Sequence, residues 1–171
     1  FEVSLSPPPY ISPTVKESLL SADFIVIGPG NLYCSLLPVL LPERMREVFT
    51  QTNAKVLYIS NLMQKPLHTK DYTLRDYVEV IEDTIGREVD YVLANSHSIS
   101  DSTLSRYEEA EQSTPIFNDM VDSERTLLRD IMSNTIETQK PGDLLQRTLI
   151  RHDPDKLAVF FSEFLSKKTE V

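Results

Sequence analysis

Glycine and small polar residues follow three apolar runs of this sequence, and their types suit them to hold a ligand. Residues 28–31 (Gly-Pro-Gly-Asn) follow the first run, while Asn61 and Asn95 follow the second and third. Glycines let backbone N–H groups approach an anion without a Cβ in the way, and a helix starting just after them adds partial positive charge. The loop matches neither the P-loop nor the Gly-x-Gly-x-x-Gly pattern. A phosphate-binding loop and an ordinary strand-to-helix turn both remain open.

The reactive side chains are dispersed, so the sequence assigns no catalytic residue and no metal site. The three histidines and the single cysteine have no metal-ligand spacing; they are His68, His97, His152 and Cys34. Ser35 lacks the Gly-x-Ser-x-Gly surroundings of a nucleophile elbow. His152 stands between Arg151 and Asp153, where two roles are open: a hydrogen bond at the start of a helix, or a ligand contact or general base.

Three continuous apolar runs form the framework that positions these residues. Residues 24–27, 56–59 and 91–94 are apolar without alternation, as is typical of strands covered on both faces. Helical spacing in the segments between them predicts crossover helices. The sequence therefore predicts an α/β fold, a doubly wound, mostly parallel, Rossmann-like sheet flanked by helices. Ligands bind beyond the carboxyl ends of such strands, so we expect Gly28, Asn61 and Asn95 to line one edge.

Capping residues predict where several helices begin and end. Thr73 with Asp76 resembles a capping box and Gly86 suits a C-cap, which predicts a helix over 74–85. Ser12 and Asp153, each followed by proline, predict helices to about Ser21 and through the Phe160 to Phe164 stripe. Weaker patterns predict helices around 41–49, 102–111 and 123–132, and short strands at 115–117 and 148–150.

Composition limits the classes of function. The 171 residues fit a single domain portion, preceded by an extended leading segment over 1–12 that contains three consecutive prolines. A net charge of −9 argues against a nucleic-acid polymer as partner. No apolar stretch approaches the ~20 residues that cross a bilayer, so we expect no membrane insertion. A single cysteine and the lack of a signal segment favour the cytoplasm.

Residues 22–38 (Ala-Asp-Phe-Ile-Val-Ile-Gly-Pro-Gly-Asn-Leu-Tyr-Cys-Ser-Leu-Leu-Pro) closely resemble the gluconeogenesis factor family, whose members are related to 2-phospho-L-lactate transferase. The likeness continues in the same order at 58–63, 72–76, 90–95 and 151–158. Family members are about twice as long, so the chain resembles the C-terminal half of one. The resemblance also implies either a missing N-terminal half or a homo-oligomer.

The family resemblance implies a cytoplasmic regulatory protein that binds a nucleotide-linked ligand, a nucleotide sugar, and acts in carbon metabolism and cell morphogenesis. The implied ligand-binding residues are Gly28, Pro29, Gly30, Asn31, Tyr33, Ser35, Asn61, Met63 and Asn95, with Thr69 and His152 as further candidates. One alternative is a transferase that passes a phospholactyl group to a deazaflavin with the help of Mg²⁺. Another is an interaction module without a ligand, favoured by Leu67-His68 where the family has Gly-Glu.

Overall fold

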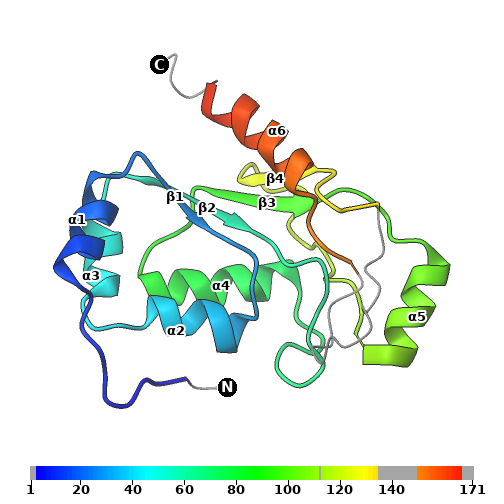
Figure 1. The fold of residues 1–171 in the computed structure, drawn as a ribbon, viewed down its shortest axis with the longest axis horizontal. Helices are drawn as coiled ribbons and strands as arrows, with labels where there is room; N and C mark the ends of the chain where they lie inside the picture. The colour runs from blue at the N-terminus through cyan, green and yellow to red at the C-terminus, as the bar shows by residue number, and fades with distance from the viewer. Residues whose placement is uncertain (1–2, 112, 135–149, 167–171) are drawn as a thin grey trace, which may run out of the picture.

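The computed structural model describes residues 3–111, 113–134 and 150–166, and Figure 1 shows its fold. Four strands form one sheet in sequence order: β1 (Phe24–Ile27), β2 (Lys55–Ile59), β3 (Tyr91–Asn95) and β4 (Thr126–Arg129). Every neighbouring pair of strands is parallel. The predicted α/β fold and the common direction of the three predicted strands are confirmed.

Helices lie on both faces of the sheet (Figure 1). One face is covered by α2 (Leu37–Leu40), α3 (Met45–Gln51) and α4 (Leu74–Ile85), and α1 (Pro13–Ser21) packs beside α3. The opposite face is covered by α6 (Pro154–Ser166). The remaining helix, α5 (Asp101–Glu111), lies beyond the carboxyl ends of the strands. These carboxyl ends and α5 therefore surround the region where a ligand is expected.

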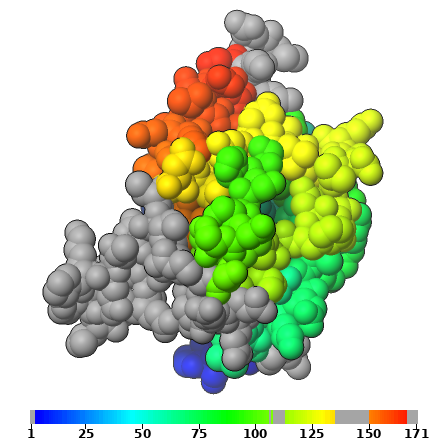
Figure 2. All heavy atoms as spheres, turned by 90° about the vertical axis from the view of Figure 1, so that its right-hand side faces the viewer, coloured from blue at the N-terminus to red at the C-terminus, as the bar shows by residue number. Residues whose placement is uncertain are grey.

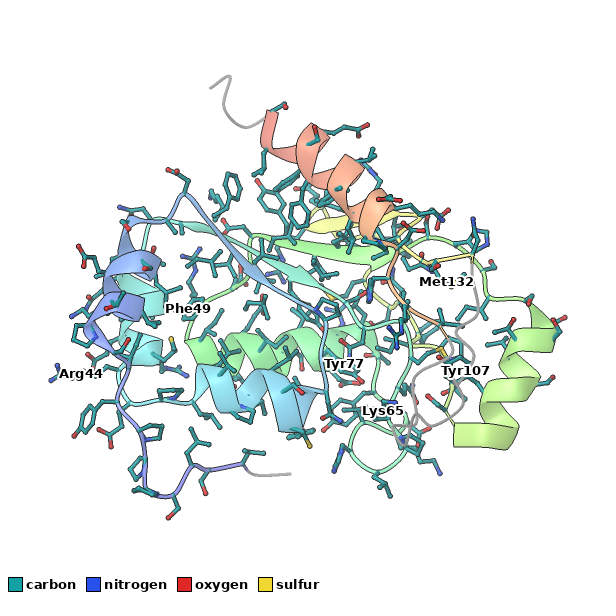
Figure 3. All side chains as sticks on the ribbon, viewed as in Figure 1. Arg44, Phe49, Lys65, Tyr77, Tyr107 and Met132 are labelled. Carbon is teal, nitrogen blue, oxygen red and sulfur yellow. The ribbon has the colours of Figure 1, made fainter. Side chains whose placement is uncertain are left out.

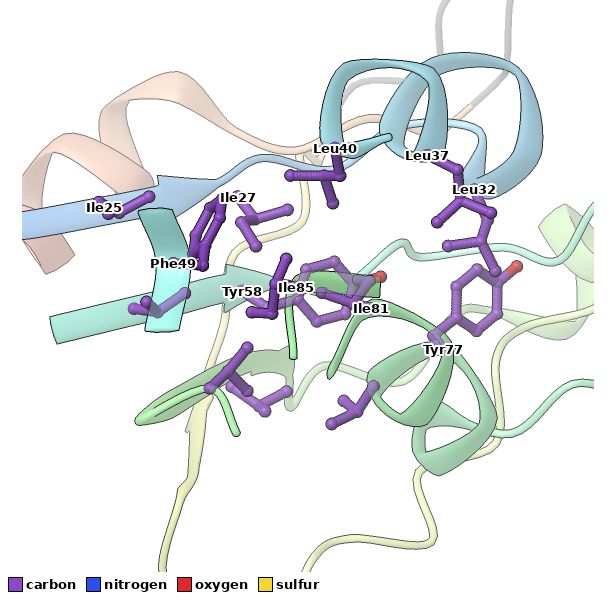
Figure 4. Close-up of a cluster of buried hydrophobic side chains, with 14 of the residues drawn as sticks. Ile25, Ile27, Leu32, Leu37, Leu40, Phe49, Tyr58, Tyr77, Ile81 and Ile85 are labelled. Carbon is purple, nitrogen blue, oxygen red and sulfur yellow. The ribbon is translucent and has the colours of Figure 1, made fainter. Parts of the chain in front are cut away.

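The hydrophobic core is split by the sheet into two clusters. On the α4 face, Ile27 and Tyr58 pack with Ile81 (Figure 4). On the α6 face, Leu57 and Leu93 pack against Phe160. Successive strand residues point to opposite faces, so the buried positions of β2 and β3 need apolar side chains on both faces, as their continuous apolar runs predicted.

The capping signals gave correct helix boundaries. Thr73 and Asp76 form a reciprocal capping box at the start of α4, and Gly86 ends it at a φ of 76°, in the left-handed region that favours glycine. Ser12 accepts the Val15 N–H at the start of α1. The predicted aromatic stripe of α6 faces the sheet, with Phe160 buried.

Several local predictions are wrong. Residues 123–132 do not form a helix, because Thr126–Arg129 instead pairs with β3 as β4. The helix predicted around 41–49 is interrupted between α2 and α3, where Pro42 has no N–H and Arg44 has a φ of 70°.

The remaining departures concern short segments and one strand face. Residues 115–117 form only isolated bridges, and 148–149 lie outside the described residues. Val26 of β1 is 45% exposed although full coverage of the strand was predicted. Within the described residues β1 pairs only with β2, so it is an edge strand.

Candidate functional site

The glycine loop after β1 is held by the side chain of Asn61, which follows β2. The Gly30 N–H donates to Asn61 Oδ1 at 3.1 Å, and Asn61 Nδ2 donates to the Gly30 carbonyl at 2.8 Å. The Asn61 side-chain amide thus forms hydrogen bonds with both the N–H and the carbonyl of Gly30. The predicted convergence of the two strand ends is confirmed, and the contact fixes the course of the loop.

The next residue, Asn31, caps the helical segment that follows. Its Oδ1 accepts the Cys34 N–H at 3.1 Å, at the start of a short π-helical segment, η1 (Leu32–Leu36). Its carbonyl accepts the N–H groups of Ser35 and Leu36. The strand therefore turns directly into a helix, as expected from the sequence.

Asn95 at the end of β3 is also engaged with the backbone. Its Oδ1 accepts the Ile131 N–H at 3.2 Å and its Nδ2 donates to the His97 carbonyl at 2.8 Å. These bonds join the loop after β3 to the residues that follow β4. Asn95 thus lies at the predicted edge and shapes its wall.

Tyr33 and Thr69 lie in a hydroxyl network under the loop. The hydroxyls of Tyr33 and Tyr72 are 2.8 Å apart, and burial, together with Tyr72, raises the pKa of Tyr33 to about 12. The Tyr77 hydroxyl donates to Thr69 Oγ1 at 2.6 Å, and Thr69 Oγ1 accepts the Lys65 N–H. Both predicted residues are buried, and Thr69 closes the loop over 64–69 through Lys65 whereas Tyr33 pairs with Tyr72.

A cavity of about 350 Å³, here called the anion pocket, opens beside the glycine loop. It lies beyond the ends of β1 and β2 and against the chain that leads into α6. Figure 3 shows Lys65 and Tyr107 at this end of the molecule. Its lining residues are Pro29, Gly30, Asn31, Asn61, Leu62, Met63, Lys65, Tyr107, Ile150, Arg151 and His152.

The charge of this cavity is opposite to that of the chain. Lys65 and Arg151 line it, and none of its described lining residues is an aspartate or glutamate. The whole chain carries 26 acidic against 17 basic residues, so a described lining with two cations and no acidic residue differs from the composition of the chain. Positive charge next to backbone amides attracts anions such as phosphate.

His152 enters the same cavity as a neutral imidazole. Its Nε2 lies 3.0 Å from the Ser60 carbonyl. A carbonyl can only accept a hydrogen bond, so Nε2 carries the proton and Nδ1 keeps its lone pair. Burial lowers the pKa of His152, although the Ser60 contact opposes this. His152 therefore makes a structural hydrogen bond to the end of β2, whereas Asp153 caps the start of α6 in place of the helix-entry bond considered for His152.

The described residues place no group of three His, Cys, Asp or Glu side chains where they could hold a metal ion. Mg²⁺ is normally held by one or two carboxylates together with phosphates of the substrate. The described polar groups of the anion pocket are amides, the Tyr107 hydroxyl, an imidazole and two cations, which do not fit that ion.

The structure brings together six of the eleven predicted site residues, Pro29, Gly30, Asn31, Asn61, Met63 and His152, in the anion pocket. Gly28 and Ser35 instead line an apolar groove along β1. Sequence reasoning missed Lys65, Tyr107 and Arg151. Only Arg151 had a visible signal, since it belongs to the Arg-His-Asp segment of the resemblance, whereas the loop and α5 positions depend on tertiary contacts.

The fold and this pocket define an α/β protein of Rossmann-like architecture with a cavity at the strand ends that is lined by the glycine loop, Lys65 and Arg151. The family model of 2-phospho-L-lactate transferase CofD matches residues 2–136, and the chain belongs to this family. A putative gluconeogenesis factor of Thermotoga maritima is 34% identical over 92% of this chain and 48% of its own length. The gluconeogenesis factor of Bacillus subtilis is 32% identical over 91% of this chain and 47% of its own.

A solved structure has the same fold. A UPF0052 family protein of Bacillus halodurans superposes with a TM-score of 0.73 at 28% identity, covering 87% of this chain and 45% of that one. A putative gluconeogenesis factor from Nostoc is 33% identical over 88% of this chain and 32% of its own length. The chain thus spans between 28% and 48% of the length of the curated relatives that it matches. No helix among the described residues has the length and apolarity to cross a bilayer.

Proposed function

We propose that this protein binds a nucleotide sugar, with the phosphates of the ligand in the anion pocket. The observation that carries the proposal is that Lys65 and Arg151 line the same cavity as Gly30 and Asn31 of the glycine loop. Cations and backbone amides are the groups that recognise phosphates. The relatives named as gluconeogenesis factors support a regulatory role in carbon metabolism. The proposal includes a cytoplasmic location and a part in cell morphogenesis.

The glycine loop supports this proposal through its close approach to the cavity. Gly30 lines the pocket, and a Cβ built there would lie 3.0 Å from the Leu36 side chain. Gly30→Val would therefore displace Leu36 as well as narrow the pocket, so the expected loss of tenfold or more in ligand affinity would have two causes. Variants that remove a charge from the pocket without adding volume separate these causes better.

The test compares Lys65→Gln and Arg151→Gln with Lys70→Gln, a matched change at an exposed position that does not line the pocket. Titration calorimetry with UDP-glucose and UDP should show binding to wild type. Each pocket variant should lose about tenfold in affinity, or roughly 1.4 kcal/mol. The Lys70 variant should bind like wild type. Unchanged affinity in folded pocket variants, or no binding to wild type, would overturn the proposal.

The family description favours one second candidate, a transferase of the 2-phospho-L-lactate type. In that reaction a deazaflavin hydroxyl releases its proton to solvent water as its oxygen forms a bond to the phosphorus of a phospholactyl group. The bond from that phosphorus to the nucleotide breaks, and a nucleoside monophosphate leaves. Incubation of the protein with both substrates, followed by mass spectrometry of the product, tests this candidate. If neither transfer nor nucleotide binding is observed, the remaining hypothesis is an interaction module that binds no small ligand.

A further inference from the structure

A second cavity lies at the carboxyl ends of β2 and β3, directly beside the anion pocket. Its volume is about 170 Å³, and it shares Asn61 and Leu62 with the anion pocket. Figure 2 faces this end of the molecule, where α5 and residues 113–134 come together. The lining residues are Ser60, Asn61, Leu62, Leu74, Ala94, Asn95, His97, Ser98, Ile99, Leu104, Pro115, Ile116 and Asn118. We call it the neutral cavity.

The two cavities differ in charge. The described lining of the neutral cavity holds no carboxylate, ammonium or guanidinium group, whereas Lys65 and Arg151 line its neighbour. Its polar groups are amides, hydroxyls and an imidazole, set against apolar side chains such as Leu74 and Ile116. A phosphate would gain nothing from leaving the cations for this lining. An uncharged ligand group is the better match.

The polar groups of the neutral cavity suit hydroxyls. A buried hydroxyl needs hydrogen-bond partners, and amides offer both donors and acceptors. The Asn118 Oδ1 accepts the Met120 N–H at 3.0 Å, which orients the side chain and presents its NH₂ group as a donor. Asn95 is held on both sides by backbone groups, so this part of the wall is rigid.

We propose that the neutral cavity is a subsite for the uncharged sugar of a nucleotide sugar, reached across Asn61 from phosphates in the anion pocket. The inference rests on the proposed function. Cavities of about 350 and 170 Å³ that share a wall are together in the range of ~300–1,000 Å³ that small-molecule sites occupy. The sequence predicted Asn61 and Asn95 at this edge, but only the folded chain brings His97, Ser98 and Asn118 to the same cavity.

The test separates the sugar from the phosphates by comparing UDP-glucose with UDP. Ser98 is exposed and lines the neutral cavity, so Ser98→Phe should block it. Ser96 is an exposed neighbour that does not line it, which makes Ser96→Phe the matched control. In calorimetry Ser98→Phe should lower UDP-glucose affinity about tenfold and leave UDP affinity unchanged. The control should change neither.

A second variant keeps the test decisive if Ser98→Phe fails to fold. Asn118→Asp retains the oxygen that accepts the Met120 N–H and removes the NH₂ donor. Because the new carboxylate also repels the phosphates of both ligands, the test is the ratio of the two affinities: UDP-glucose should lose at least threefold more affinity than UDP. Equal effects on both ligands, or none, would overturn the subsite while leaving the proposed function intact. Failure of wild type to bind either ligand would overturn both.

Discussion

The side-chain amide of Asn61 holds the glycine loop in place, so its removal should lower the free energy of unfolding even without a ligand. Asn61→Ala deletes two part-buried hydrogen bonds, at 3.1 and 2.8 Å, that hold Gly30. A typical intramolecular hydrogen bond contributes about 0.5–1.5 kcal/mol net, so the variant should lose about 1–3 kcal/mol of unfolding free energy. For a protein of this size each kcal/mol lowers the Tm by about 2–4 °C.

Urea unfolding followed by far-UV circular dichroism measures this loss through the midpoint at constant m value. Asn53→Ala is the matched control, because Asn53 is exposed on the connection between α3 and β2 and should shift by less than about 0.5 kcal/mol. Asn61→Asp adds a sharper comparison, since it keeps the acceptor for the Gly30 N–H but sets a carboxylate against the Gly30 carbonyl. It should be at least as destabilised as Asn61→Ala. If Asn61→Ala unfolds like the Asn53 control, the amide does not hold the loop.

Three further predictions concern titration and the sheet edge. Burial lowers the pKa of His152 in the folded protein, so below about pH 6.5 the unfolded chain protonates this imidazole more readily and the free energy of unfolding declines. His152→Gln should flatten this decline, measured by urea unfolding at pH 7 and pH 5.5. Burial alone would raise the pKa of Asp90, but the hydrogen bonds from the Lys55 ammonium and the Val56 N–H outweigh burial and lower the pKa. Asp90→Asn should therefore lower the free energy of unfolding by about 1–3 kcal/mol at pH 7 and by progressively less below pH 4, measured by thermal unfolding. Val26→Lys should reduce self-association of the 171-residue chain in analytical ultracentrifugation, because a charged side chain on an edge strand opposes pairing with another chain. An unchanged mass distribution would show that β1 is not part of a contact between chains.

Local patterns in the sequence determined the elements whose physics is local. The α4 helix was predictable to its ends, because a cap such as Thr73 with Asp76 satisfies backbone groups three residues away and Gly86 adopts a φ that other residues avoid. The strands β2 and β3 were predictable because a strand buried on both faces is apolar at its buried positions, and β1 has the same apolar run although Val26 is 45% exposed. Their common direction placed Gly30 and Asn61 together.

Tertiary structure alone decided the features that depend on distant neighbours. Residues 126–129 became β4 because the free edge of β3 offers parallel hydrogen bonds, which outweigh a weak helical spacing. Asn61 forms a hydrogen bond with Gly30, and Lys65 lines the same cavity as Arg151. Both arrangements bring together residues that are far apart along the chain. No local pattern encodes such a meeting, since it depends on how crossovers and loops pack. The charge of the anion pocket therefore emerges only once the chain is folded.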